Sequence, residues 1–300
     1  MQVLSIGEVL WDIFPDGERL GGAPLNFSAH LKRFGDEVIL LSSVGDDHRG
    51  RSAREGMRQL GLSSLGMKVS PALPTGTAVI IGETDGSHRF AIPRPAAFDD
   101  LELPPEILER AKSGSFDWLY FGTLVQMTRS VEQITQALVD SSDHLRCFYD
   151  MNLREGHWSL DLVQRLAESA SILKTNHAEA ELLHDLIHGA NHHFSLQGFC
   201  MEWSQKHNID VICITCGGEG CFVYERGAVA SVPGWPVEVC DTVGAGDAFS
   251  AAFLHAYANH WPVERAARYA NALGAIVASR AGATPDWSMD ELERMLGEQG

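Results

Sequence analysis

Short apolar, β-branched runs alternate along the chain with longer segments in which hydrophobic positions recur at helical spacing. The apolar runs predict strands at 3–6, 38–43, 118–121, 147–149, 172–174 and 211–215. The periodic segments predict helices over 24–34, 49–60, 131–139, 161–169 and 178–186. Strand and helix alternating at this spacing are typical of a parallel sheet covered by helices on both faces. The pattern therefore predicts an α/β fold.

Two stretches interrupt the alternation. Residues 77–92 read as a β-hairpin that turns at Asp85-Gly86, and residues 9–14 form a second β-like piece that turns at 15–17. Strands without helices between them predict a small sheet apart from the main one, which we interpret as a lid over the end of the parallel strands. Near the carboxyl end, a hairpin (222–224 with 229–232) precedes helices at 245–258 and 263–279.

Composition narrows the class of protein. Of the 300 residues, 45% are hydrophobic and 21% charged, which fits a globular chain, and the apolar runs are far shorter than the about 20 residues that cross a bilayer. A net charge of −17 disfavours nucleic acid and anionic membranes as partners. The first residues have no basic segment of a secretion signal, and six scattered cysteines need not form disulfides. We expect a reduced, cytoplasmic protein.

Two patterns have the spacing of metal ligands. Cys213 and Cys216 form a C-x-x-C, but in a β-type run residues three apart point to opposite faces, so buried thiols are the better interpretation. His184 and His188 form an i, i+4 pair that could hold a metal ion, followed by His192 and His193. The sequence places no carboxylate beside that pair, and this segment is interpreted as a solvated helix end.

The sharpest local signal is the segment 241–254. Gly244 and Gly246 flank one alanine, and an apolar helical stripe begins at once. A glycine-rich turn that opens a helix exposes unpaired backbone N–H groups at the positive end of the helix dipole, which is an anion site. Asp247 lies off the apolar stripe and could accept a proton from a hydroxyl held beside a phosphate. The alternative is an aspartate that only stabilises the helix start.

A second signal follows the first predicted strand. Gly21 and Gly22 let a backbone come close to a ligand, and Asn26 offers a donor and an acceptor from the first helical turns. With Asp12 just upstream, they predict a site for sugar hydroxyls, although each could also belong to a surface turn. The chain has no P-loop motif, and no Gly-x-Gly-x-x-Gly follows the first strand, which disfavours a P-loop nucleotide fold and a dinucleotide dehydrogenase.

Together these residues resemble the ribokinase-like (PfkB-type) carbohydrate kinase family over almost the whole chain. Residues 21–35 are similar to its first signature, and 241–254 to its second, with Val243 in the place of a more common residue. The resemblance implies a three-layer α/β/α fold with a central, mainly parallel sheet and a small β-sheet lid. It also implies a single domain over 1–300, with the lid formed by about 9–20 and 77–98.

The resemblance also implies roles for individual residues. Asp247 would be the catalytic base, and Gly244, Ala245 and Gly246 would complete the anion hole. The sugar would be bound by Asp12, Gly21, Gly22, Asn26, Arg94 and Arg154. ATP would be bound near Asn176, Glu179, Thr215, Gly217, Gly218, Gly220 and Asn271. Glu179 would hold Mg²⁺ through water, and Asp241, Val243 and Gly282 would hold a monovalent cation such as K⁺.

The chain looks most like the fructokinase branch of this family, on the segments 7–12, 21–26, 89–97 and 149–158. That likeness predicts ATP-dependent phosphorylation of a hydroxymethyl group of a free sugar, fructose to fructose 6-phosphate. Alternatives are a 2-keto-3-deoxygluconate kinase, another sugar or nucleoside kinase, and a non-catalytic sugar sensor on the same fold. Lid sheets in this family often pair between subunits, which predicts a homodimer.

Overall fold

The computed structural model describes residues 1–84 and 87–297, with the backbone alone at 80, 82–84 and 87–89. The chain forms two compact units. The first consists of Met1–Arg146 and Arg154–His157, and the second of Cys147–Leu153 and Trp158–Gly300. Each unit has its own strands and helices, and we describe them in turn.

The first unit is built on parallel strands in the order β8-β1-β4-β5. Their bounds are β8 Trp118–Gly122, β1 Gln2–Ile6, β4 Glu37–Gly45 and β5 Met67–Ser70. The helices of this unit are α1 Ala23–Arg33, α2 His48–Gln59, α3 Pro105–Lys112 and α4 Arg129–Val139, with short 3-10 turns η1 Ala97–Asp99 and η2 Leu124–Met127. Val3, Leu4 and Ile6 of β1 are fully buried, as expected for a strand covered on both faces.

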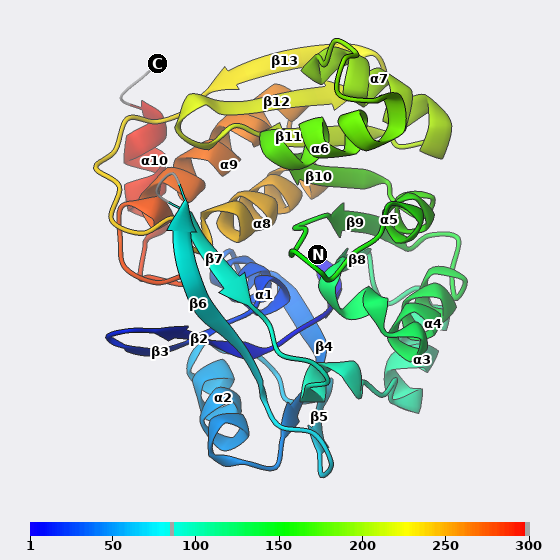
Figure 1. Ribbon diagram of the computed structural model, residues 1–300, viewed down its shortest axis with the longest axis vertical. Coiled ribbons are helices and arrows are strands. Elements are labelled where there is room, and N and C mark those ends of the chain that lie inside the picture. Colours follow the sequence, from blue (N-terminus) through cyan, green and yellow to red (C-terminus); the bar gives the residue numbers. More distant parts are fainter. Residues whose placement is uncertain (85–86, 298–300) are drawn as a thin grey trace. The chain divides into compact units, whose positions relative to one another are not determined.

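A smaller sheet in the same unit has the order β3-β2-β6-β7. It consists of β2 Leu10–Phe14, β3 Gly17–Gly21, β6 Gly76–Thr84 and β7 Ser87–Ala91 (Figure 1). The strands β2 and β3 are antiparallel, β2 and β6 are parallel, and β6 and β7 are antiparallel. The predicted separate sheet is thus confirmed, while the turn predicted at Asp85-Gly86 lies outside the described residues. Its role as a lid stays a prediction.

The second unit is also built on parallel strands, with helices between them. Strands β9 Arg146–Asp150, β10 Ile172–Asn176 and β11 Val211–Thr215 are parallel, and β12 Gly220–Glu225 and β13 Ala228–Pro233 follow antiparallel. The helices are α5 Leu160–Ala167, α6 His177–His188, α7 Leu196–His207, α8 Ala245–Ala258, α9 Val263–Ala278 and α10 Met289–Gly297, with a 3-10 turn η3 Gly217–Glu219. In Figure 1, α6 and α7 (green) cover a different side of these strands from α8 and α9 (gold to orange).

Every strand and helix predicted from the pattern is present within about two residues of its expected bounds. The sequence reading missed β5, α3, α7 and α10. Within the described ranges, no helix has the length and apolar character needed to cross a membrane.

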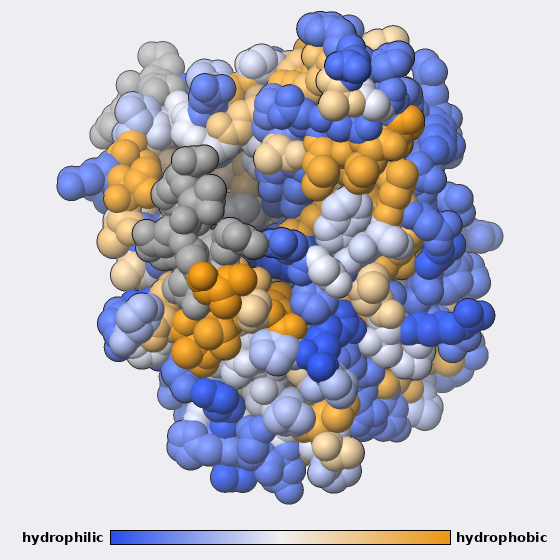
Figure 2. Space-filling view, viewed as in Figure 1, coloured by the Kyte–Doolittle hydropathy of each residue, from blue (hydrophilic) through white to orange (hydrophobic). Residues whose placement is uncertain are grey.

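The surface seen in Figure 2 is mostly hydrophilic, with separate apolar patches, one of them in the region of α6. Leu182 and Leu186 of that helix are 43% and 53% exposed. The six cysteines are free thiols, and Cys213 is fully buried on β11. Burial raises the pKa of the Cys213 thiol well above its ordinary value, so this group is not a reactive thiolate. The interpretation of a buried thiol is confirmed for Cys213 and is wrong for Cys216, which is only half-buried because it lies just beyond the end of β11.

Asp47 joins α2 to the segment that leads into the small sheet. Its carboxylate caps α2 by accepting from the Gly50 N–H at 2.7 Å, and it accepts from the N–H and hydroxyl of Thr75 at 2.8 and 2.7 Å. Burial works against ionisation here, but the bonds from Thr75 and Gly50 and the charge of Arg49 outweigh it. The pKa of Asp47 therefore lies below its ordinary value.

We expect Asp47→Ala to lower the free energy of unfolding by about 2–3 kcal/mol at pH 7, because one cap and two further hydrogen bonds are lost. Asp47→Ser, which keeps a capping oxygen, should lose about half as much. A carboxylate with a lowered pKa stabilises the fold above its unfolded pKa of about 3.9, and that contribution disappears as the pH falls through the lower folded pKa. Urea unfolding should thus show a difference from wild type that is constant between pH 7 and 5 and narrows below about pH 4. A difference that stays constant at lower pH would contradict this role.

Candidate active site

The predicted glycine turn opens α8. Gly244 precedes the helix with φ 80°, in the left-handed region. A Cβ at this position would lie 2.5 Å from the Cα of Ala283, so only glycine fits. The first α8 hydrogen bond runs from the Ala248 N–H to the Gly244 carbonyl at 2.9 Å. The amides of the first turn have no acceptor within the helix and are suited to an anion.

Asp247 lies in this first turn and is 8% exposed. Its carboxylate is placed at the positive end of the α8 dipole, which stabilises the charged form. A buried carboxylate beside a row of backbone donors is placed for proton transfer next to a bound anion. The same placement also stabilises the helix start.

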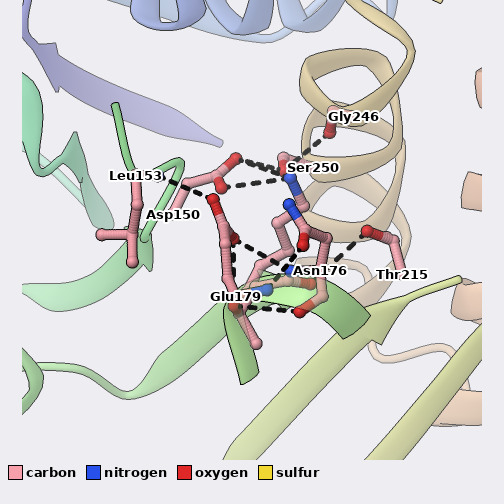
Figure 3. A network of polar contacts seen from close by, with 9 residues as sticks. Asp150, Leu153, Asn176, Glu179, Thr215, Gly246 and Ser250 are labelled. Atoms are coloured by element: carbon pink, nitrogen blue, oxygen red, sulfur yellow. Dashed lines mark hydrogen bonds and ion pairs between the residues drawn. The ribbon is translucent and has the colours of Figure 1, made fainter. Parts of the chain in front are cut away.

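A buried ion pair lies next to the turn (Figure 3). The Lys174 ammonium on β10 is 3.1 Å from the Asp150 carboxylate at the end of β9, and these side chains are 8% and 0% exposed. The Ser250 hydroxyl of α8 is 2.8 Å from Asp150 Oδ2 and 3.0 Å from the Gly246 carbonyl. A Cβ on Gly246 would lie 3.0 Å from Lys174 Nζ, so the ammonium sits directly against the anion turn.

The charge state of Lys174 follows from its neighbours. Burial lowers the pKa of a lysine, but the carboxylates of Asp150, Glu179 and Asp247 raise it more, so the pKa of Lys174 lies above its ordinary value. The side chain is therefore a fixed positive charge at neutral pH. Sequence reasoning gave Lys174 no role, although a lysine inside an apolar strand next to Asn176 was a signal that could have identified it.

Asn176 and Glu179 are brought together at the start of α6 as a capping box. The Asn176 side chain accepts from the Glu179 N–H at 2.9 Å, and the Glu179 carboxylate accepts from the Asn176 N–H at 3.1 Å. Glu179 also accepts from the Leu153 N–H at 2.7 Å and the Thr175 hydroxyl at 3.0 Å (Figure 3). Both carboxylate oxygens are thus engaged by protein donors, which fits a role toward a metal ion through water rather than by direct coordination.

Several residues predicted to bind ATP surround a surface hollow of about 470 Å³ in the second unit. Its lining is Asn176, His177, Ala178, Thr215, Cys216, Gly217 and Glu219. The exposed Gly218 lies in the adjoining turn η3, and Gly220 begins β12 with φ 103°, where a Cβ would lie 2.1 Å from the Val232 carbonyl oxygen. Asn271 is not among the lining residues. Its side-chain amide donates to the Val232 and Pro233 carbonyls at 3.1 and 3.2 Å and thereby fixes β13 to α9.

The three residues predicted to hold a monovalent cation also come together. The Asp241 carboxylate accepts from the Val243 N–H and from the Gly282 N–H, both at 3.0 Å. This bridge fixes the segment at Gly282 beside the glycine turn. A carboxylate and the neighbouring backbone carbonyls are oxygen donors of the kind that a hard cation needs.

The predicted sugar residues of the first unit gather around the start of α1. A Cβ on Gly21 would lie 2.3 Å from Asp12 Oδ2, so the Asp12 carboxylate faces this glycine. Gly22 precedes α1 with φ 115°, and a Cβ there would lie 2.4 Å from the Glu8 carbonyl oxygen. Asn26, in the next turn, is 3% exposed. The Asp12 carboxylate thus faces the glycine pair that precedes the helix of Asn26, and sugar binding by these residues stays a prediction.

The two predicted sugar-binding arginines belong to the same unit. The Arg94 guanidinium pairs with Asp99, and it donates to the Leu124 carbonyl at 2.8 Å and the Thr128 hydroxyl at 2.7 Å. Arg94 thus has a structural task, and its predicted contact with the sugar stays a prediction. Arg154 is half-buried, in the segment that contains His157. Burial and then the charge of Arg94 lower the pKa of His157.

Comparison with known proteins agrees with this geometry. Residues 16–289 match the pfkB family of carbohydrate kinases. The chain is 28% identical to fructokinase-1 of Oryza sativa subsp. japonica over 94% of this chain and 93% of that protein. It is 27% identical to an ATP-dependent ribose-1-phosphate kinase of Halopiger xanaduensis over 100% and 99%. The crystal structure of a fructokinase with bound ATP from Xylella fastidiosa superposes with a TM-score of 0.85 at 21% identity, over 99% of this chain and 98% of that one.

These matches confirm the predicted fold, a ribokinase-like three-layer α/β/α architecture with a small additional sheet. They also confirm the predicted class of enzyme, a phosphotransferase that acts on a sugar hydroxyl. The glycine turn at the start of α8 offers backbone donors of the kind that bind a phosphate. The chain belongs to the pfkB family of carbohydrate kinases.

Proposed function

We propose that this chain transfers the terminal phosphoryl group of ATP to the hydroxymethyl group of free fructose, giving fructose 6-phosphate. The observation that carries the proposal is the arrangement around the α8 start. There the buried Asp247 carboxylate, the amides of the glycine turn and the Lys174 ammonium lie together. The choice of fructose is supported by the likeness to fructokinases along nearly the full chain.

In the proposed reaction, Asp247 takes the proton from the attacking hydroxyl of the sugar. The negative charge on the transferring phosphoryl group is stabilised by the amides of residues 244–247 and by the Lys174 ammonium. Because these groups are fixed before the reaction by the Gly244 turn and the Asp150 ion pair, they need no costly reorganisation. Positioning and electrostatics supply the rate acceleration.

The remaining residues bind and orient the reactants. Asp12 and Asn26 bind sugar hydroxyls, and ATP lies along the hollow lined by Asn176, Thr215 and Gly217. Mg²⁺, when bound, neutralises the phosphate oxygens, and Glu179 would hold it through water. A monovalent cation would be held at Asp241, Val243 and Gly282. The small sheet is the lid over the sugar, and its edge pairs with a second copy in a homodimer.

Two other functions deserve a direct comparison. A kinase for another sugar, such as 2-keto-3-deoxygluconate or a pentose, is supported by the identity to the ribose-1-phosphate kinase, which at 27% is close to the 28% identity to fructokinase-1. A non-catalytic sugar sensor would have no need for an acid at the α8 start, and this chain has Asp247 there.

A coupled assay of ADP release tests the substrate directly. With ATP and Mg²⁺, we expect fructose to give the highest kcat/KM among fructose, 2-keto-3-deoxygluconate, ribose, ribose 1-phosphate, glucose and adenosine. A preference of tenfold or more for another compound, which corresponds to about 1.4 kcal/mol in transition-state binding, would refute the choice of fructose and leave the kinase chemistry intact. No ADP release with any sugar would favour the sensor.

A further inference from the structure

The histidine pair predicted on the helix at 178–186 has a carboxylate partner that the sequence did not reveal. His184 and His188 lie one turn apart on α6, with ring centroids 4.7 Å from each other. Glu202 comes from the neighbouring helix α7, and its two carboxylate oxygens are 2.9 and 3.1 Å from His188 Nε2. One ligand atom from each of the three residues lies within 4.8 Å of the others.

The environment of His184 indicates that the cluster is more than a surface ion pair. His184 Nε2 is buried and has no hydrogen-bond partner among the described residues. The His184 ring packs against Phe194, with the ring centroids 5.5 Å apart. A buried imidazole nitrogen without a partner costs free energy, and a metal ion would satisfy it.

We propose that His184, His188 and Glu202 bind a divalent transition-metal ion of the Zn²⁺ type, which links α6 to α7. Two imidazole nitrogens and one carboxylate oxygen form a His₂Glu set, and water or a further side chain completes the tetrahedron. The His192 ring lies 5.9 Å from that of His188 and is a candidate for the fourth position.

The observed spacing suits this ion. Tetrahedral ligands at 2.0–2.1 Å from zinc stand about 3.3 Å apart. The His188–Glu202 contact of 2.9–3.1 Å is slightly shorter, so the ion would replace the proton that now joins these groups, with a small outward shift. The ligand atom of His184 lies within 4.8 Å of the other two, so binding would require a side-chain rotation that brings it closer to them. Imidazole ligands favour zinc, nickel, cobalt or copper ions over Mg²⁺, which prefers an all-oxygen set.

This site is separate from the proposed kinase chemistry. Glu179, which belongs to that chemistry, is in the first turn of α6, whereas His188 ends the helix, nine residues or about 13.5 Å further along the axis. The inference therefore does not depend on the identity of the sugar. Binding of the ion would raise the stability of the chain, because an ion that binds only the folded chain shifts the folding equilibrium toward the folded state.

The test uses the full chain without an affinity tag, freed of metal by a chelator and dialysed. Isothermal titration calorimetry with ZnCl₂ should show one ion bound per chain with micromolar or tighter affinity. The melting temperature should rise by about 5 °C at free zinc a hundredfold above the Kd. Binding of Co²⁺ should produce the visible absorption of a tetrahedral site, and MgCl₂ alone should produce neither effect.

Two variants decide between this site and adventitious binding, for example at the exposed Cys240. His188→Ala and Glu202→Gln should each weaken zinc binding at least tenfold and remove the increase in melting temperature. His144→Ala, at an exposed histidine of the first unit, is the matched control and should behave as wild type. Circular dichroism checks that the variants are folded. The proposal would be overturned if the wild-type chain bound no zinc at about 100 µM free ion. It would also be overturned if the two variants bound zinc as tightly as the wild-type chain does.

Discussion

Asp247→Asn is expected to lower kcat by about 10²–10⁴ while the chain still folds and binds sugar and ATP. Asparagine keeps the size of the side chain and can stand in the first turn of α8, but it cannot accept the proton of the attacking hydroxyl. The loss should fall on kcat rather than KM, because the missing interaction belongs to the transition state. Steady-state kinetics and a melting curve on the same preparation measure both properties.

The competing explanation is that Asp247 only stabilises the helix start, which is worth about 0.3–1 kcal/mol. Glu264→Gln provides a matched control, because Glu264 occupies the first turn of the neighbouring helix α9. It should show the small stability change of a lost helix-dipole interaction with kcat unchanged. If Asp247→Asn resembles this control and keeps more than about a tenth of kcat, the proton leaves by another route.

Lys174→Met should cost about 3–5 kcal/mol of folding free energy, because it leaves Asp150 fully buried without the ammonium that neutralises it. Activity should also fall sharply, since the positive charge against the Gly246 turn is removed. Chemical unfolding and kcat measurements report the two losses. Lys206→Met, at an exposed lysine of the same unit, is the control for removing a charge and should leave both properties nearly unchanged.

A second change separates stability from catalysis at this position. Lys174→Met combined with Asp150→Leu replaces the whole buried ion pair by apolar groups, which is often neutral or stabilising. The double variant should therefore recover most of the lost folding free energy while kcat stays low. The free energy of unfolding of Lys174→Met could instead lie within about 1 kcal/mol of the wild-type value, or the double variant could be no more stable than the single one. Either result would show that other groups compensate the buried charge of Asp150.

The parts of the fold that could be predicted from sequence are those whose signal is local. The β1 run of apolar residues and the glycine turn before α8 can each be recognised from their own residues alone. The missed elements have weaker patterns. The strand β5 has four residues, one of them a lysine, and α3 has eight residues and begins at the second of two adjacent prolines. Short elements like these depend on tertiary packing more than on periodicity.

The candidate site shows the same division. Asp247 could be proposed as the base because its motif is contiguous, whereas the roles proposed for Lys174 and Glu202 depend on what the fold places beside them. Lys174 is held by an ion pair with Asp150, which is 24 residues away in sequence on the next strand. Glu202 reaches His188 only because α7 exists and packs on α6, and α7 was not predicted. Pairing between elements cannot be read from the spacing of one segment.

The Asn176–Glu179 capping box has a consequence for the interpretation of mutational scans. Glu179 accepts hydrogen bonds from two backbone amides and one hydroxyl, so its truncation to alanine would leave three donors without their acceptor and loosen the start of α6. A loss of cellular growth or of bulk turnover in such a variant would mix reduced abundance with reduced chemistry. In a deep scan of this chain, a strong effect at position 179 alone is therefore weak evidence for magnesium or nucleotide binding. The score there becomes informative only when it is normalised to the amount of folded protein.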